Sequence, residues 1–136
     1  MPAADRSVSV SRVLVLEEEL GFQTLLTEVL GGAGHEVVSA QSGAAALDLA
    51  SERPFDLLLV DNRMPGISGL EFLKRFRAID PHAPVIIMTA YADVPVVVEA
   101  MRLGVIDFLV KPFSLDSLLP LVERSLRAAA RPNPSP

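Results

Sequence analysis

Short apolar runs of strand length alternate along the chain with segments whose apolar residues recur at helical spacing. The runs lie at 13–16, 37–38, 57–60, 85–88 and 108–110. The helical segments that follow them cover 20–30, 42–50, 68–79, 94–103 and 114–130. Because the runs are apolar throughout rather than alternating, we expect helices on both faces of a parallel sheet. The pattern predicts an α/β fold built from five βα units.

Local signals indicate where several predicted helices begin and end. Ser42, Asp93 and Ser114 stand directly before helical segments, where their side chains can cap the first turn. The glycines at 31, 32 and 34 are expected to end the first helix. Pro120 lies inside the last predicted helix, where a proline costs about 3 kcal/mol unless the helix bends.

Composition narrows the classes of function. The chain has 136 residues, half of them apolar, which suits one domain with a substantial core and excludes global disorder. It has no cysteine, so a disulfide scaffold, a thiolate zinc site and a cysteine nucleophile are excluded. The two histidines, His35 and His82, are expected in solvated loops. With 17 acidic and 12 basic residues the net charge is −5, which argues against binding to nucleic acid.

The ends of the chain differ from its centre. Residues 1–11 are polar and are expected to form a flexible N-terminal tail, and 131–136 (Arg-Pro-Asn-Pro-Ser-Pro) a proline-rich linker or tail. The domain is expected at 12–130. The N-terminus has no apolar core of signal-peptide length, and every apolar run is far shorter than the roughly 20 residues of a membrane span. We therefore expect a soluble cytoplasmic protein, either complete in itself or part of a longer one.

Polar and charged residues follow four of the five predicted strands. The first strand ends in the acidic run 17–19, the third in Asp61, the fourth in Thr89 and the fifth in Lys111. Each alone has an ordinary interpretation as a helix N-terminus, a cap or a turn, but the ends of parallel strands meet at one edge of a sheet. Oxygen ligands without cysteine or histidine suit Mg²⁺. Together with a lysine and a hydroxyl, they favour a site for a phosphoryl group.

Three motifs then indicate a family. The segment Asp56-Leu-Leu-Leu-Val-Asp61-Asn-Arg-Met-Pro-Gly-Ile-Ser-Gly69 resembles the phosphoacceptor region of response-regulator receiver domains, and so do 85–90 and 107–113. Order and spacing match over about residues 11–128. The stretch 92–104 is most similar to receivers of nitrogen-regulation, dicarboxylate-transport and nitrogen-fixation regulators.

This resemblance implies a flavodoxin-like (βα)₅ fold, a doubly wound sandwich with strand order 2-1-3-4-5. It implies a phosphorelay role as a signalling module rather than a multiple-turnover enzyme. Asp61 would attack the phosphorus of a phosphohistidine presented by a partner histidine kinase. Lys111 and Thr89 would each bind a phosphoryl oxygen, and Phe108 falls where the family has a switching aromatic residue.

The resemblance also implies a Mg²⁺ site. Glu18 would be the main acidic ligand with Glu17 beside it, and Asp61 and the backbone carbonyl of Arg63 would complete the protein ligands. The family more often has aspartate at the second acidic position. The extra methylene of Glu18 shifts its carboxylate, while Mg²⁺ demands near-ideal octahedral geometry. Glu18 is therefore expected to bind the metal weakly, through water, or to pair with Lys111 instead.

Three alternatives stay open at this stage. A degenerate receiver would act as a phosphorylation-independent protein-interaction module; Glu18 favours this, whereas Asp61, Thr89 and Lys111 together favour phosphorylation. A nucleotide- or flavin-binding enzyme of similar fold would need a glycine-rich loop after the first strand, which the sequence lacks. A phosphatase with Asp61 as nucleophile would need a second aspartate where Arg63 stands.

An output surface is expected on the helix at 94–103, the fifth strand and the last helix. Three consecutive valines, 96–98, cannot all face the core at about 100° per residue, so at least one should point outward. Its partner would be an output domain, another protein or a second copy of the chain. By contrast, Phe22, Phe72 and Phe76 recur at helical spacing and are expected in the core.

Overall fold

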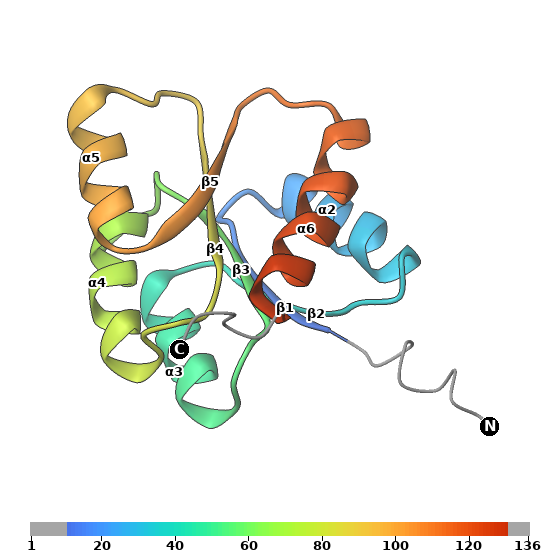
Figure 1. Ribbon diagram of the computed structural model, residues 1–136, viewed down its shortest axis with the longest axis horizontal. Helices are drawn as coiled ribbons and strands as arrows, with labels where there is room; N and C mark the ends of the chain where they lie inside the picture. The colour runs from blue at the N-terminus through green and yellow to red at the C-terminus, as the bar shows by residue number, and fades with distance from the viewer. Residues whose placement is uncertain (1–10, 131–136) are drawn as a thin grey trace, which may run out of the picture.

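Five strands alternate with five helices in the computed structural model, which describes residues 11–130 (Figure 1). The elements in chain order are β1 (Arg12–Leu16), α2 (Leu20–Gly32), β2 (Glu36–Ala40), α3 (Gly43–Glu52), β3 (Leu57–Asp61), α4 (Gly69–Ile79), β4 (Val85–Thr89), α5 (Val94–Arg102), β5 (Val105–Val110) and α6 (Leu115–Ala130).

The strands form one parallel sheet in the order β2-β1-β3-β4-β5, which confirms the expected fold class and topology. Helices α3, α4 and α5 cover one face of the sheet, and α2 and α6 cover the other (Figure 1). The chain leaves β1 toward β2 and returns on its other side to β3, so the carboxyl ends of β1 and β3 lie at the switch point of the sheet.

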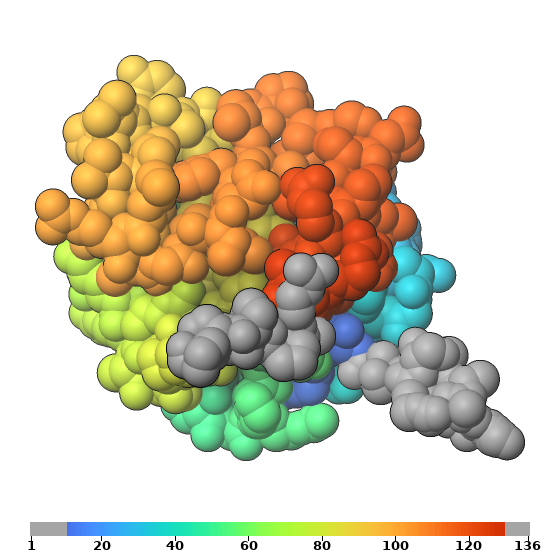
Figure 2. Space-filling model, viewed as in Figure 1, coloured from blue at the N-terminus to red at the C-terminus, as the bar shows by residue number. Residues whose placement is uncertain are grey.

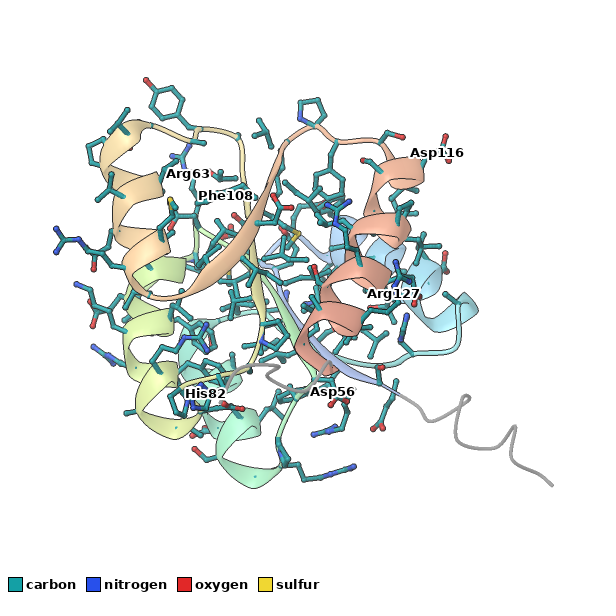
Figure 3. The ribbon with its side chains drawn as sticks, in the orientation of Figure 1. Asp56, Arg63, His82, Phe108, Asp116 and Arg127 are labelled. Carbon is teal, nitrogen blue, oxygen red and sulfur yellow. The ribbon has the colours of Figure 1, made fainter. Side chains whose placement is uncertain are left out.

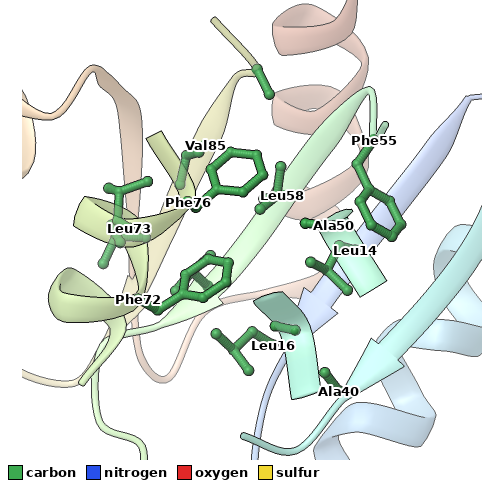
Figure 4. Packing of buried hydrophobic residues seen from close by; sticks show 14 of the residues in the cluster. Leu14, Leu16, Ala40, Ala50, Phe55, Leu58, Phe72, Leu73, Phe76 and Val85 are labelled. Atoms are coloured by element: carbon green, nitrogen blue, oxygen red, sulfur yellow. The ribbon is translucent and has the colours of Figure 1, made fainter. Parts of the chain in front are cut away.

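The two faces of the sheet share the apolar runs between them. Leu14 and Leu58 point to the face of α3–α5, whereas Val13 and Leu59 point to the face of α2 and α6. All four side chains are fully buried, which explains why the strands carry no alternating polar pattern. Figure 4 shows the first of these two clusters, in which the strands pack against buried residues of the helices, among them Ala50, Phe72, Leu73 and Phe76.

The expected helix caps are present. The side chains of Ser42 and Asp93 accept hydrogen bonds from the third residue of α3 and of α5, and Ser114 Oγ accepts one from the N–H of Asp116 at 3.0 Å. Helix α2 extends further than expected, to Gly32, because of the three glycines expected to end it only Gly34 has a positive φ, 99°, which breaks the helical path. Helix α6 is continuous across Pro120.

Three expectations about side-chain environment have mixed outcomes. Phe72 and Phe76 are buried as expected, but Phe22 is only half-buried. His82 is exposed as expected, whereas the prediction of a solvated His35 is wrong: its imidazole is 8% exposed, and its Nε2 lies 2.9 Å from Glu123 Oε2. The loop between α2 and β2 packs against α6, and this long-range contact removes His35 from water.

The predicted tails lie almost wholly outside the described residues, at 1–10 and 131–136. Ser11, the last residue of the predicted N-terminal tail, accepts a hydrogen bond from the N–H of Glu36 at 2.9 Å and so extends the pairing of β1 with β2. Within 11–130, no helix has the length and apolar character needed to cross a membrane.

Candidate functional site

Main-chain hydrogen bonds extend the sheet at the carboxyl ends of its five strands. The N–H of Glu17 donates to the end of β2, the N–H of Asn62 donates to Met88 O at 2.9 Å, and the N–H of Lys111 donates to Thr89 O at 2.8 Å. These bonds fix the backbone at the strand ends that carry the polar residues of the predicted site. The sheet therefore brings the predicted site residues to one edge, as the sequence predicted.

Lys111 joins two buried carboxylates at this edge. Its Nζ lies 3.0 Å from Glu17 Oε1 and 2.8 Å from Asp61 Oδ2. The side chains of Glu17 and Asp61 are only 2% and 8% exposed, against 25% for Lys111. A buried carboxylate is tolerated only with a charge or hydrogen-bond partner, and here one ammonium serves both. We refer to Glu17, Lys111 and Asp61 as the acid–lysine triad.

The second oxygen of each carboxylate accepts a main-chain hydrogen bond. Asp61 Oδ1 accepts from the N–H of Arg63 at 2.9 Å, and Glu17 Oε2 accepts from the N–H of Glu19 at 3.1 Å. The turn that follows each strand therefore holds the carboxylate of the residue just before it. Each of the two carboxylates is therefore held by Lys111 through one oxygen and by a main-chain N–H through the other.

The charged form of Glu17 is disfavoured in the triad. Burial raises the pKa of Glu17, and the nearby charge of Asp61 adds to the rise, although hydrogen bonds from Lys111 and the N–H of Glu19 oppose it. Burial alone would lower the pKa of Lys111, but its hydrogen bonds to Asp61 and Glu17 outweigh burial, so that pKa is raised. Two carboxylates share one firmly protonated ammonium, and a further cation would relieve their repulsion.

A hollow of about 690 Å³ opens beside the triad. Its lining includes Glu17, Asp61 and Lys111, together with Glu18 and the loop 62–65 that follows β3. Figure 3 shows Arg63, from that loop, at this edge of the sheet, with Asp56 and His82 at the opposite edge. Asp61 is thus buried yet lies at the wall of an open hollow.

Glu17 and Glu18 occupy different environments. Glu17 is buried in the triad, and it is Glu17 that pairs with Lys111, whereas Glu18 is exposed at the hollow. The described residues contain no group of three or more histidine, aspartate or glutamate side chains placed to hold a metal ion. A metal would therefore depend on fewer carboxylates, on main-chain oxygen and on water.

The donor set nevertheless fits Mg²⁺. Glu17, Glu18 and Asp61 present only carboxylate oxygens, which a hard cation prefers. Asn62 follows Asp61 in the lining of the hollow, and its Oδ1 is a buried acceptor with no hydrogen-bond partner within the described chain. A buried acceptor of this kind calls for a donor, a water or a cation that the protein itself does not supply.

Thr89 is buried beside the site, but its hydroxyl is engaged elsewhere. Thr89 Oγ1 donates to Tyr91 O at 3.0 Å and accepts from Tyr91 N at 3.1 Å. We call this pair of hydrogen bonds the Thr89–Tyr91 latch. It holds the loop between β4 and α5, so the position of the hydroxyl and the path of the loop are coupled.

Phe108 lies on β5, on the side of the sheet that α5 covers. Its ring is half-buried against the cluster of α3, α4 and α5 (Figure 3). Thr89 pairs with Val110 in the sheet, two residues beyond Phe108 on the neighbouring strand. The two residues expected to switch thus lie on adjacent strands, at the face that leads to α5.

Helix α4 begins very close to the end of β3. The N–H of Gly69 donates to Asn62 O at 3.0 Å, and a Cβ at Gly69 would lie 2.5 Å from Asp61 O. Only glycine permits this approach without moving the backbone that carries the Asp61 side chain. The motif residue eight positions after Asp61 therefore has a steric role in the site.

A comparison with protein-family models decides the family. Residues 13–123 match the model of the response regulator receiver domain. The chain belongs to this family. The expected family is confirmed, and it is a family of signalling modules rather than of catalytic enzymes.

Individual relatives of the receiver agree with this membership. It is 41% identical over 114 residues to the transcriptional regulatory protein ZraR of Escherichia coli O157:H7, covering 84% of this chain and 26% of the regulator. It is 36% identical over 115 residues to sporulation initiation phosphotransferase F of Bacillus subtilis, covering 85% of this chain and 93% of that protein. The receiver therefore spans about a quarter of the regulator but nearly all of the phosphotransferase.

A solved structure supports the fold of the receiver. The CheY-like response regulator receiver domain protein of Methanospirillum hungatei superposes with a TM-score of 0.86, covering 89% of this chain and 97% of that one, at 24% identity. The match to a transcriptional regulator also agrees with the expected resemblance to regulators of the nitrogen-regulation type.

Three contributors to the site were not found from the sequence. Phe22 was expected in the core, yet its ring lies beside Lys111, with 4.9 Å between Nζ and the ring centroid. The main chain of Tyr91 holds Thr89 by two hydrogen bonds, and Asn62, in the lining of the hollow, carries a buried oxygen without a hydrogen-bond partner in the described chain. The position of Phe22 in the first turn after the acidic run was the one available signal, because that turn starts at the site edge.

The raised pKa of Glu17 predicts a pH-dependent stability. The charged form of Glu17 is disfavoured in the folded receiver, which lowers the free energy of unfolding at pH 7. This loss of stability disappears as the pH falls through the folded pKa to the ordinary value of 4.5. Glu17→Gln removes the charge and keeps an acceptor for Lys111. Without divalent metal, we expect its free energy of unfolding to exceed that of the wild type at pH 7, with a gap that closes below pH 4.5.

Urea unfolding followed by circular dichroism at a series of pH values measures this gap. Glu52→Gln, at an exposed carboxylate near the end of α3, controls for the substitution itself. A wild type more stable than Glu17→Gln at pH 7, or a gap independent of pH, would contradict the prediction.

Proposed function

We propose that this receiver accepts a phosphoryl group on Asp61 from the phosphohistidine of a partner histidine kinase and switches an output surface in response. Membership of the family supports a phosphorelay role in general terms. The observation that carries the assignment to Asp61 is its position: a buried carboxylate at the wall of an open hollow, 2.8 Å from a lysine ammonium.

The transfer needs a nucleophile in line with the phosphorus and charge stabilisation around it. An oxygen of Asp61 forms the new P–O bond while the P–N bond to the imidazole of the kinase breaks. The electron pair of that bond stays on the imidazole nitrogen. Lys111, already within 2.8 Å of Asp61 Oδ2, binds an oxygen of the phosphoryl group and offsets its negative charge.

Mg²⁺, when bound, neutralises charge on the phosphoryl oxygens and on the carboxylates. The residues that would hold it are Glu18, Asp61 and the backbone carbonyl of Arg63, with Glu17 next to them. Glu17 already accepts from Lys111, so it is less available than the exposed Glu18. Glu18 is therefore the main acidic ligand for the metal, with the misfit of its longer side chain.

The Thr89–Tyr91 latch links this chemistry to the rest of the fold. To donate to a phosphoryl oxygen, the Thr89 hydroxyl must give up its hydrogen bond to Tyr91 O, and turning the side chain toward Asp61 also takes Oγ1 away from the N–H of Tyr91. Both changes free the loop before α5. Phe108 can then move into space that Thr89 leaves. The phosphoryl group biases α5 only through its different affinity for the two states, and a coupling of about 1–3 kcal/mol shifts their populations several-fold to a hundredfold.

The surface formed by α5, β5 and α6 is the proposed output surface, and it is the near face in Figure 2. As expected for the valine run, Val98 points outward, with 46% of its surface exposed. It lies in a row along α5 with Val94 and Met101, which are 73% and 66% exposed. Exposed apolar groups gathered on one face favour a protein partner: an output domain, another protein or a second copy of the chain.

The first prediction from this proposal concerns the acceptor. Incubation with a small acyl-phosphate donor and Mg²⁺ should add one phosphoryl group to the wild type, and Asp61→Asn should abolish the addition because the amide is a far weaker nucleophile. Intact-mass spectrometry measures the uptake. Asp48→Asn, at an exposed aspartate on α3, is the matched control and should take up as much as the wild type. Equal uptake by Asp61→Asn would refute the assignment.

The second prediction concerns the metal. Glu18→Asp shortens the ligand and should tighten Mg²⁺ binding by about tenfold, the scale on which ligand placement changes metal affinity. It should also speed phosphorylation by acyl phosphate. Calorimetric titration gives the affinity, and Glu52→Asp, the same change at an exposed glutamate at the end of α3 and outside the hollow, is the control. Unchanged or weaker Mg²⁺ binding in Glu18→Asp would argue against the misfit.

The third prediction concerns the switch. Phosphorylation should speed amide hydrogen exchange at Tyr91, because its N–H donates to Thr89 in the unmodified state, and should alter exchange along 90–110. Residues 36–52, which form α3 and the edge strand β2 at the opposite end of the sheet from β5, serve as the internal reference. Asp61→Asn under the same conditions should show no change. Identical exchange over 90–110 in a demonstrably phosphorylated sample would exclude this face as the switch.

A further inference from the structure

The ammonium of Lys111 has an aromatic neighbour as well as its two carboxylates. Its Nζ lies 4.9 Å from the centroid of the Phe22 ring, within the range in which a cation is attracted to the face of an aromatic ring. Two of the three N–H donors of Lys111 serve Glu17 and Asp61, so one remains for a phosphoryl oxygen. The ring adds a third fixed neighbour without using a donor.

The local structure holds Phe22 in this place from two sides. Glu19 caps α2 by accepting from the N–H of Phe22 at 2.7 Å, which fixes the first turn of the helix. The ring of Phe113 meets that of Phe22 edge-on, with centroids 5.5 Å apart and planes at 63°. Because Phe113 follows Lys111 by two residues, the same loop carries the ammonium and the ring that supports Phe22.

Lys111 also stands between two hollows. One is the acidic hollow beside Asp61, and the other, of about 460 Å³, has a largely apolar lining that includes Phe22 and Phe113. A lysine side chain is long and flexible, so without a wall on the apolar side its ammonium could turn away from Asp61 into water. Phe22 supplies that wall.

We propose that Phe22 is a positioning residue for phosphoryl transfer, whose ring face holds the Lys111 ammonium against Glu17 and Asp61. The inference rests on the proposed function, since the contact of Lys111 with the phosphoryl group belongs to it. Phe22→Leu removes the ring but keeps an apolar side chain. Phosphorylation by a subsaturating acyl phosphate should then slow by about two- to fivefold, the factor that a partly exposed cation–π contact corresponds to.

Lysine labelled with ¹³C at Cε gives a direct readout of the contact, because the chain has only two lysines, Lys74 and Lys111. Lys74→Arg assigns the two signals. The ring current of Phe22 should displace the Lys111 signal in the wild type. That displacement should vanish in Phe22→Leu and persist in Phe22→Tyr, which keeps the ring face and should keep the wild-type rate.

Phe55→Leu is the matched control, since it removes a ring of the same size that also lies under a cation, the Arg12 guanidinium 4.3 Å from its centroid, but away from the site. It should keep the wild-type rate. Thermal unfolding of each variant checks that it folds, and Asp61→Asn sets the zero of uptake. A wild-type rate in Phe22→Leu, failure of Phe22→Tyr to restore the rate, or equal slowing by Phe55→Leu would overturn the inference. No uptake by the wild type would instead overturn the proposed function, with the Lys111 signal still reporting the contact.

Discussion

The ion pairs of Lys111 with Glu17 and Asp61 are the interaction on which the rest of the site depends. Two carboxylates are almost completely buried at one edge of the sheet, and removing their shared ammonium would leave both uncompensated, an arrangement that costs several kcal/mol in general. The triad also joins the ends of β1, β3 and β5, three strands that are not consecutive in the chain. Charge compensation and strand placement therefore support each other.

The parallel sheet makes this arrangement possible. Helices cover both faces of the sheet, so the central strands β1, β3 and β4 bury nearly all their side chains in the two apolar clusters. Their polar chemistry is therefore confined to the carboxyl ends. The turns that leave those ends hold the carboxylates of Glu17 and Asp61 through their main-chain N–H groups. The Thr89–Tyr91 latch extends the same principle to β4, where one hydroxyl determines the path of the loop to α5.

Identical residue types acquire different roles at this edge. Glu17, directly after β1, is buried and pairs with Lys111, whereas the next residue, Glu18, is exposed at the hollow. Phe72 and Phe76 stack in the core, while Phe22, of the same type and at similar helical spacing, ends beside a cation. The side-chain type sets what a residue can do, and its position relative to the strand ends decides which of those things it does.

The sequence alone determined the order of elements, the parallel sheet, the caps at Ser42 and Asp93, and the strand ends that carry Asp61, Thr89 and Lys111. These depend on periodicity and on neighbours within a few residues, which a linear pattern records. Only the tertiary structure decided that Glu17 rather than Glu18 pairs with Lys111, that His35 is buried against Glu123, and that Phe22 faces an ammonium. Each of these contacts joins segments about 90 residues apart, so it depends on how helices and loops pack rather than on local sequence.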